Sequence, residues 1–165
     1  MRKILVALLF ASFVYGGELR EIKSKIESVN KSLSELTLQQ KKIGNSLVEL
    51  KIKLYRDKSG VVRKMSIEAE WEDAVFESGE YIYSKDGSLL YSLVSSFNAD
   101  FKRECYVKIK SYFRDKKPLK KYKLLNSGCD KYEDYQVLQK SLPYLPPKID
   151  NPLKFFKNPA KELDI

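Results

Sequence analysis

Residues 19–54, LREIKSKIESVNKSLSELTLQQKKIGNSLVELKIKL, carry apolar side chains spaced three and four positions apart. If Leu19 is the first position of a seven-residue repeat, every a and d position except Gln40 is apolar. Such a sustained repeat is typical of a coiled coil. We therefore predict a coiled coil over residues 18–56 that makes the chain a homo-oligomer. Its core residues would be Leu19, Ile22, Ile26, Val29, Leu33, Leu36, Gln40, Ile43, Leu47, Leu50 and Leu54.

An alternative for this stretch is an amphipathic helix that packs on its own globular domain, which normally has a broader apolar face. Gln40 would fix the register of a coiled coil at some cost in stability. Gly44 weakens a helix by ~1 kcal/mol relative to alanine. The number of helices in the oligomer stays open.

The first residues have the pattern of an export signal peptide. Arg2 and Lys3 precede an apolar core from Ile4 to Tyr15, and Val14 and Gly16 suit cleavage after Gly16. The apolar run is shorter than the ~20 residues of a membrane-spanning helix. We predict a cleaved signal peptide over residues 1–16 and a periplasmic protein, with an inner-membrane anchor facing the periplasm as the alternative.

The chain is basic, with a formal net charge of +9 over 165 residues and a pI near 9.4. A basic surface favours nucleic acid or an anionic surface as a partner. An exported protein meets little nucleic acid, so we expect no nucleic-acid partner. The lysines from Lys116 to Lys123 are expected at a hairpin, as a solvated tip or as a contact with anionic envelope lipid or polymer.

Both cysteines, Cys105 and Cys129, lie in the C-terminal part of the chain. An even cysteine count in an exported chain favours a disulfide bond. We predict a Cys105–Cys129 disulfide, and the alternative is two unrelated buried thiols.

The middle of the chain begins with a turn at Asp57 to Gly60 that ends the repeat. From Ser66 to Phe76 the apolar residues share one helical face, and the carboxylates between them would form its solvated side. Residues 81–93 are ambiguous, because Asp86-Gly87 suits a hairpin turn whereas Ser88 suits a helix cap. We predict a helix from Ser88 to Phe101.

The C-terminal part alternates apolar and polar residues from Cys105 to Phe113, which predicts a half-buried strand. A turn from Arg114 to Lys117 and a weaker strand from Leu119 to Leu125 follow. A helix capped by Asp130 would end at Pro143. Beyond the extended Pro146-Pro147 we expect a helical turn near 153–156 and an extended end at 163–165.

The segments CYVKIK, NSGCD, YEDYQVLQKS, LPYLPP and FFKNPAKELDI occur in this order between residues 105 and 165. Their order and spacing resemble the TolA and TonB C-terminal-domain family over roughly residues 89–165. The resemblance implies an α+β fold with a three-stranded antiparallel sheet and helices packed on one side. It also implies a Cys105–Cys129 disulfide and a non-enzymatic connector that binds Tol-Pal-like envelope proteins, partly by strand addition at a sheet edge.

The sequence contains no pattern that predicts a catalytic or metal-binding site. It contains no histidine, which is the usual general base and a common metal ligand. We therefore expect no catalytic residue, no cofactor and no metal site. The tyrosines are expected in the core or in a binding face: Tyr81, Tyr83, Tyr91, Tyr106, Tyr112, Tyr122, Tyr132, Tyr135 and Tyr144.

Together these patterns predict a coiled-coil helix followed by a small TolA-like domain over residues 62–165. The expected function is a periplasmic, non-enzymatic protein-binding or scaffold protein of the cell envelope. The alternatives are a membrane-anchored Tol or TonB-type energy transducer and a basic adaptor on anionic envelope polymers.

Overall fold

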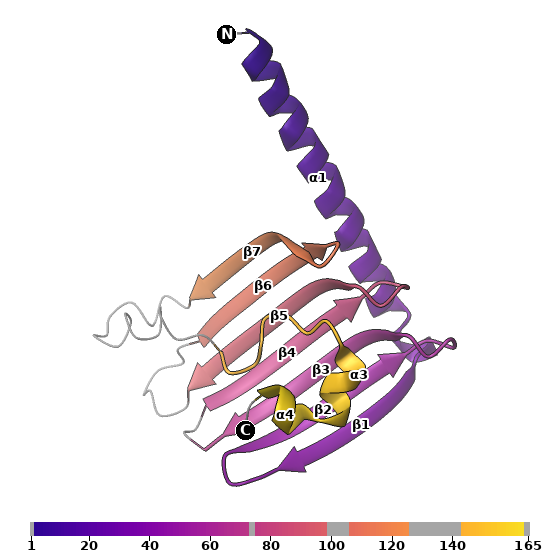
Figure 1. Cartoon of the computed structure of the whole chain (residues 1–165), viewed down its shortest axis with the longest axis vertical. Coiled ribbons are helices and arrows are strands. Elements are labelled where there is room, and N and C mark those ends of the chain that lie inside the picture. The colour runs from indigo at the N-terminus through magenta and orange to yellow at the C-terminus, as the bar shows by residue number, and fades with distance from the viewer. Residues whose placement is uncertain (1, 73–74, 99–105, 126–142, 164–165) are drawn as a thin grey trace, which may run out of the picture.

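The computed structural model describes residues 2–72, 75–98, 106–125 and 143–163, with side chains from Gly17 onward except those of Asn98 and Leu125. One antiparallel sheet dominates it, with a long helix at the N-terminal end and two short helices at the C-terminal end (Figure 1). The elements are α1 (Arg2–Lys31), η1 (Leu33–Glu35), β1 (Thr37–Gly44), β2 (Val48–Arg56), β3 (Val62–Trp71), β4 (Val75–Tyr83), β5 (Leu89–Asn98), β6 (Tyr106–Arg114), β7 (Lys117–Leu125), α3 (Pro152–Lys157) and α4 (Pro159–Leu163).

The seven strands form a meander in which each strand pairs antiparallel with the next, in the order β1 to β7. Tight turns join several neighbours. Gly87 has a φ of +81° in the β4–β5 turn, and Asp115 and Lys116 have φ values of +48° and +65° in the β6–β7 turn. Positive φ at both central residues gives a two-residue turn the twist that suits a hairpin. A tight turn can join only two strands that lie side by side, so these turns favour a sheet in which the strands follow their order in the chain.

Burial alternates along the strands, which fixes two different sheet faces. On β2 the buried residues are Val48, Leu50, Ile52 and Leu54, a spacing of two that places them on one face. These side chains belong to the main core together with Met65 and other apolar residues of β3 and β4. Burying one such side chain contributes roughly 1.5–3 kcal/mol. This face carries most of the apolar burial.

The segment 143–163, which we call the C-terminal strap, covers that core face. Leu145, Ile149 and Phe155 are buried in the same core as β2 and β3, and α3 and α4 lie over the sheet in Figure 1. Lys41 of β1 donates from Nζ to the carbonyl oxygens of Phe156 at 3.2 Å and Lys157 at 2.9 Å. A cation on these carbonyls stabilises the C-terminal end of α3. We call the sheet face that the strap covers the strap-side face.

The opposite, helix-side face receives α1. Ile22 and Val29 are buried against Ile82, Tyr91 and Tyr112 of β4, β5 and β6. Glu18 forms an ion pair with Arg114 at the end of β6. The contacts recur at helical spacing, so one stripe of α1 covers one end of this face.

The predicted coiled coil is wrong. The helix ends at Lys31, Ser32 donates from its hydroxyl to the carbonyl of Val29, and the chain continues as strands. Four of the predicted core residues, Leu19, Ile22, Ile26 and Val29, lie on α1 and pack on the sheet of the same chain. Gln40 and Ile43 lie on β1, and Leu50 and Leu54 lie on β2. Beyond Lys31 the match to a heptad is a coincidence, because Leu50 and Leu54, which are four residues apart, share one face of strand β2 just as they would share one face of a helix.

The predicted fold class is also wrong, since the sheet has seven strands instead of three. Residues 66–76 do not form a helix but the end of β3 and the start of β4, and residues 88–101 contribute β5. The rejected hairpin at Asp86-Gly87 is the turn between β4 and β5. Leu163 ends α4 and is not extended. In both segments the chain pairs in register with a neighbouring strand, and this pairing outweighs the helical spacing of the apolar residues.

Other local predictions are confirmed. The strand from Cys105 to Phe113 corresponds to β6, the strand from Leu119 to Leu125 to β7, and the helical turn at 153–156 to α3. The expected turn at Asp57 to Gly60 joins β2 to β3. The helix expected after Asp130 lies outside the described residues. Among the residues that were described, no helix is both long and apolar enough to cross a membrane.

Candidate functional site

The helix-side face is covered at one end only. α1 packs over Ile82, Leu90, Tyr91 and Tyr112. These residues lie at the end of β4, the start of β5 and the end of β6. In the contacts described, α1 does not pack against the opposite ends of these three strands. At the uncovered end of the face, Phe76 is exposed to solvent.

Three aromatic side chains form a row across the uncovered end. Phe76 of β4 pairs in register with Phe97 of β5, and Phe97 pairs with Tyr106 of β6. The ring centroids of Phe76 and Phe97 are 6.4 Å apart, with an angle of 36° between the ring planes. Phe76 is 40% exposed. Because paired residues on neighbouring strands point to the same face, the three rings line one surface.

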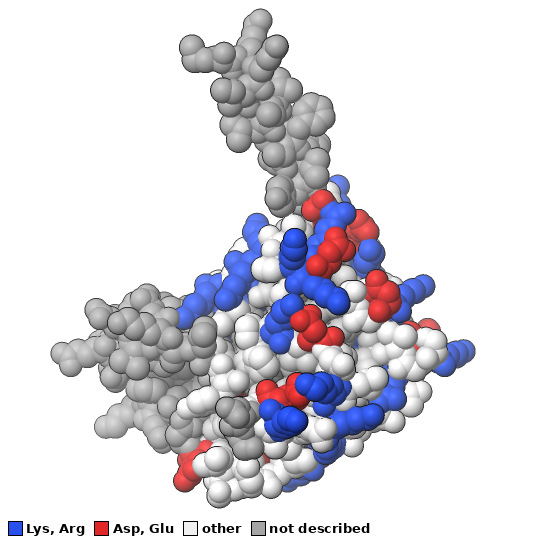
Figure 2. All heavy atoms as spheres, in the orientation of Figure 1, with Lys and Arg blue, Asp and Glu red and all other residues white. Residues whose placement is uncertain are grey.

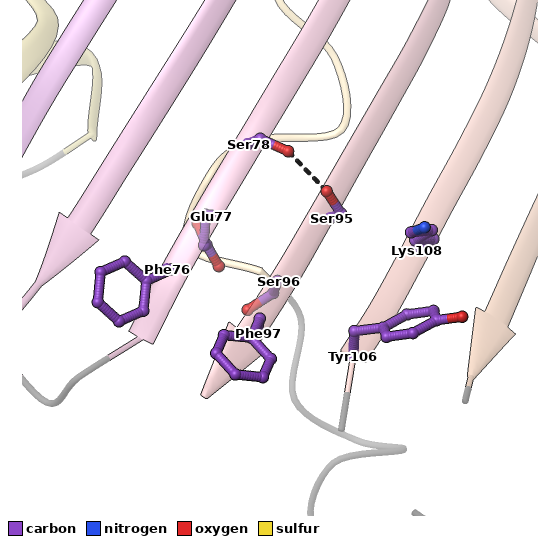
Figure 3. Close-up of a pocket in the computed structure, with 8 residues that line it drawn as sticks. All are labelled: Phe76, Glu77, Ser78, Ser95, Ser96, Phe97, Tyr106 and Lys108. Atoms are coloured by element: carbon purple, nitrogen blue, oxygen red, sulfur yellow. Dashed lines mark hydrogen bonds between the residues drawn. The ribbon is translucent and has the colours of Figure 1, made fainter. Parts of the chain in front are cut away.

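A polar row lies beside the aromatic row, two residues further along each strand. Ser78 pairs with Ser95, and Ser95 pairs with Lys108. The hydroxyl oxygens of the two serines are 2.6 Å apart (Figure 3). The two rows, together with Glu77 and Ser96 of the same strands, line a cavity of about 440 Å³, which we call the aromatic cleft. Its volume lies in the range of small-molecule sites, roughly 300–1,000 Å³, with apolar walls and a few polar groups.

Charge is distributed unevenly on this face. On the β2 and β3 side, Glu49 lies 2.9 Å from Lys42 and 3.4 Å from Lys51, and Lys53 lies 3.8 Å from Glu68. On the β5 to β7 side, the lysines lie over aromatic rings. The distances from Nζ to the ring centroid are 4.5 Å for Lys108 over Tyr106, 5.9 Å for Lys110 over Tyr91 and 4.9 Å for Lys120 over Tyr122.

A ring face attracts a cation but carries no net charge. In the described part of the chain, no carboxylate lies within ion-pair distance of Lys108, Lys110 or Lys120, whereas Lys51 and Lys53 have such partners. Among the described residues, the aromatic cleft therefore borders lysines that have no carboxylate partner. Figure 2, which views the strap side, shows Lys and Arg side chains along the β7 edge.

Directly behind the cleft, the strap-side face holds a buried carboxylate. Glu77 is only 4% exposed and accepts hydrogen bonds from the backbone N–H groups of Tyr144 at 2.8 Å and Leu145 at 2.7 Å. Burial raises the pKa of Glu77, and these backbone hydrogen bonds oppose the rise. The carboxylate is turned away from the aromatic cleft and anchors the strap.

Three more side chains of the sheet bind the strap backbone. Tyr81 and Ser92 each donate to a proline carbonyl, of Pro146 and Pro147, at 2.6 Å. Tyr83 donates to the carbonyl of Ile149 at 3.0 Å. Burial raises the pKa values of Tyr81 and Tyr83, so both hydroxyls stay protonated and can donate. Proline has no N–H, and the strap is therefore held mainly through its carbonyls.

The structure distributes the predicted site residues over both faces. Among the tyrosines, Tyr81 and Tyr83 are core residues of the strap side, and Tyr91 and Tyr112 are buried under α1. Tyr106 lines the aromatic cleft. Burial, followed by the charge of Glu80, raises the pKa of Tyr91 to about 12. Tyr132, Tyr135 and both cysteines of the predicted disulfide, Cys105 and Cys129, lie outside the described residues.

Sequence reasoning missed Phe76, Ser78, Ser95 and Phe97 as site residues. The first two fell at the end of a predicted helix or just beyond it, and the other two lay within another. The available signal was alternation with a period of two on both strands. On β4, Val75, Glu77, Gly79 and Tyr81 share one face, so Phe76 and Ser78 must lie on the other.

Within the described residues, no three cysteine or carboxylate groups are placed to hold a metal ion. No protein-family model, curated protein or solved structure matches this chain.

Proposed function

We propose that this protein is an exported, non-enzymatic binding protein of the cell envelope and that it holds its ligand in the aromatic cleft. The observation that carries the proposal is the row of Phe76, Phe97 and Tyr106 on a sheet face that α1 leaves uncovered. Exposed aromatic side chains in a concave site supply contact area to a ligand.

The remainder of the fold supports a binding role. The strap-side face is filled by the chain's own C-terminal strap, which is bound through Glu77, Tyr81, Tyr83 and Ser92. The helix-side face is half filled by α1. The end that bears the aromatic cleft offers a ligand three aromatic side chains in one row, of which Phe76 is exposed and Phe97 and Tyr106 are half-buried. A rigid seven-stranded sheet beneath the cleft keeps these side chains in place with little ordering on binding.

Export rests on the pattern of the first 16 residues. The described contacts between α1 and the sheet begin at Glu18, which pairs with Arg114, and continue with Leu19. Cleavage after Gly16 would therefore keep the described packing of α1. The absence of histidine in all 165 residues favours binding over catalysis, because the commonest general base is missing.

Co-sedimentation with envelope fragments from the source cells tests the proposal. The purified protein is expected to pellet with the fragments, and Phe97→Ala is expected to leave it in the supernatant. Leu47→Ala is the matched control, since Leu47 is a large apolar side chain that is 47% exposed in the β1–β2 turn and does not line the cleft. Failure of the wild-type protein to pellet, or equal pelleting of Phe97→Ala, would overturn the proposal.

The mass of the native protein tests export. A protein that lacks residues 1–16 and occurs in the periplasmic fraction is the expected result. A full-length mass in the membrane fraction would contradict cleavage and support the anchored alternative.

A further inference from the structure

We propose that the ligand of the aromatic cleft is an acidic saccharide, a chain of sugar rings that carries carboxylate groups. This inference rests on the proposed function, because it names the ligand class of the same site. It draws on three features in and around the cleft: the aromatic row, the adjacent hydroxyl row and the lysines that have no carboxylate partner among the described residues.

The aromatic row suits the rings of a saccharide. A pyranose ring has an apolar face of C–H groups and a rim of hydroxyls, so that it can stack on an aromatic ring while its rim stays polar. Phe76 and Phe97 are 6.4 Å apart between centroids, and Tyr106 continues the row on the next strand. The row crosses the strands, and successive sugar units could therefore contact successive rings. Stacking on an aromatic row depends on the flat apolar face of each sugar ring more than on the substituents that the ring carries.

The polar row supplies partners for the rim. Ser78 and Ser95 lie one row further along the sheet, with hydroxyl oxygens 2.6 Å apart. Each hydroxyl has one donor and two acceptor positions, so that the mutual hydrogen bond leaves capacity on both. Figure 3 shows the two serines joined by a hydrogen bond on neighbouring strands, further from the strand ends than the aromatic rings. A sugar stacked on Phe97 would therefore have hydroxyl partners beside it.

The lysines select for negative charge. Lys108 extends the serine row and lies 4.5 Å from the centroid of the Tyr106 ring, so its charge sits at the edge of the cleft. Lys110 and Lys120 lie on the same face of β6 and β7, again over rings. A neutral saccharide would leave these cations without an anion, whereas a carboxylate on the sugar would form a charge-assisted hydrogen bond.

Other ligand classes fit the same cleft less well. An acyl chain needs an enclosed apolar tunnel, but this cleft lies on one open sheet face with serines and a lysine along it. Single-stranded nucleic acid also combines stacking with negative charge, and is therefore the competing polymer that the experiment has to exclude.

Calorimetric titration of the purified protein with three probes of similar length tests the inference: an oligogalacturonate, a neutral malto-oligosaccharide and oligothymidylate. We expect the oligogalacturonate to bind more tightly than both others. Phe97→Ala and Lys108→Gln are each expected to weaken this binding by roughly fivefold or more, as loss of an aromatic or ionic contact does.

Two control variants make the test specific. Leu47→Ala removes an exposed apolar side chain outside the cleft. Lys53→Gln removes a lysine of the same sheet face that already pairs with Glu68 at 3.8 Å. Neither control is expected to change the affinity for the oligogalacturonate.

The inference is overturned if the neutral saccharide binds as tightly as the acidic one, if oligothymidylate binds most tightly, or if no saccharide binds. It is also overturned if Phe97→Ala and Lys108→Gln bind the acidic saccharide as well as the controls do. If envelope co-sedimentation still depended on Phe97 in these cases, the proposed function would stand and only the ligand class would fall.

Discussion

The carboxylate of Glu77 accepts the backbone N–H of Leu145 at 2.7 Å across 68 residues of sequence. Its second oxygen accepts the N–H of Tyr144 at 2.8 Å, so that one side chain of β4 satisfies two successive backbone donors of the strap. Leu145 itself is fully buried in the strap-side core. The strap therefore covers the core without leaving these buried donors unpaired. Since Phe76 and Ser78 flank Glu77 on β4, the strap also supports the strand that carries the aromatic cleft.

Glu77→Gln is predicted to lower the free energy of unfolding by roughly 1–3 kcal/mol, because one amide oxygen replaces two acceptors and the amide N–H₂ faces a backbone donor. Urea denaturation followed by tryptophan fluorescence measures this change. Glu68→Gln is the control, since Glu68 lies on the exposed helix-side face. Equal stability of the two variants would show that the Glu77 hydrogen bonds do not hold the strap.

The contribution of Glu77 should depend on pH. Burial raises the pKa of Glu77 in the folded state above the ordinary value of a glutamate, so ionisation of Glu77 destabilises the fold relative to the unfolded chain. Its contribution is thus fully present below the unfolded pKa and decreases as pH rises through the folded pKa. The difference in unfolding free energy between wild type and Glu77→Gln is predicted to widen as pH is lowered from 7 towards 4.5. A difference that narrows over this range would contradict the raised pKa.

Gly79→Ala is predicted to destabilise the protein by about 1–3 kcal/mol, because overpacking displaces a buried ring. A Cβ atom at Gly79 would lie 2.7 Å from Cε2 and 2.9 Å from the hydroxyl oxygen of Tyr81, which donates to Pro146. Gly44→Ala serves as the control, since the nearest atom to its Cβ would be 3.8 Å away. Thermal unfolding compares the two variants, and a smaller loss for Gly79→Ala would refute the steric account.

Ile22→Ala is predicted to lower the free energy of unfolding by about 2–4 kcal/mol, since Ile22 is a buried contact between α1 and the sheet. Leu38→Ala should have little effect, because Leu38 is 43% exposed. Chemical denaturation at two protein concentrations is the measurement. A midpoint that rises with concentration would indicate that α1 packs between chains, contrary to the fold described here.

The Cys105–Cys129 disulfide stays a prediction from the sequence. The flanking strand ends lie side by side, because Val107 near the start of β6 pairs with Leu125 at the end of β7. Cys129→Ser is predicted to lower stability by ~3 kcal/mol, the chain-entropy value for a loop of this size. Alkylation of the native protein without reductant should add no mass. Two alkylated thiols, or an unchanged melting temperature of the variant, would contradict the bond.

The sequence predicted the strands best where alternation was unambiguous and a turn followed. β6 and β7 were recognised from the alternation after Cys105 and from the lysine-rich turn, and α3 from the local pattern around Leu153. β2 was missed because Leu47, Leu50 and Leu54 satisfy a helical spacing as well, while Val48 and Ile52 complete a period of two. A short window could not decide between the two periods, and pairing with β1 and β3 decided for the strand.

The candidate site could not be predicted from the sequence because its residues meet only through strand register. Phe76 and Phe97 are 21 residues apart and meet only through the register of β4 and β5. The sequence analysis placed Phe97 in a helix from Ser88 to Phe101, where it would have faced the core instead of a binding site. Tyr106 and Lys108 lay on a correctly predicted strand, but the sequence did not show which strand lies beside it. Register is a tertiary property and sets which side chains share a face.

The most direct test of the central claim is a map of backbone amide shifts in the ¹⁵N-labelled protein during titration with solubilised envelope fragments. The account predicts that the largest shifts cluster at residues 76–78, 95–97 and 106–108, and that the strap residues 144–149 change little. Shifts confined to the β7 edge, to α1 or to the strap would contradict a ligand site in the aromatic cleft.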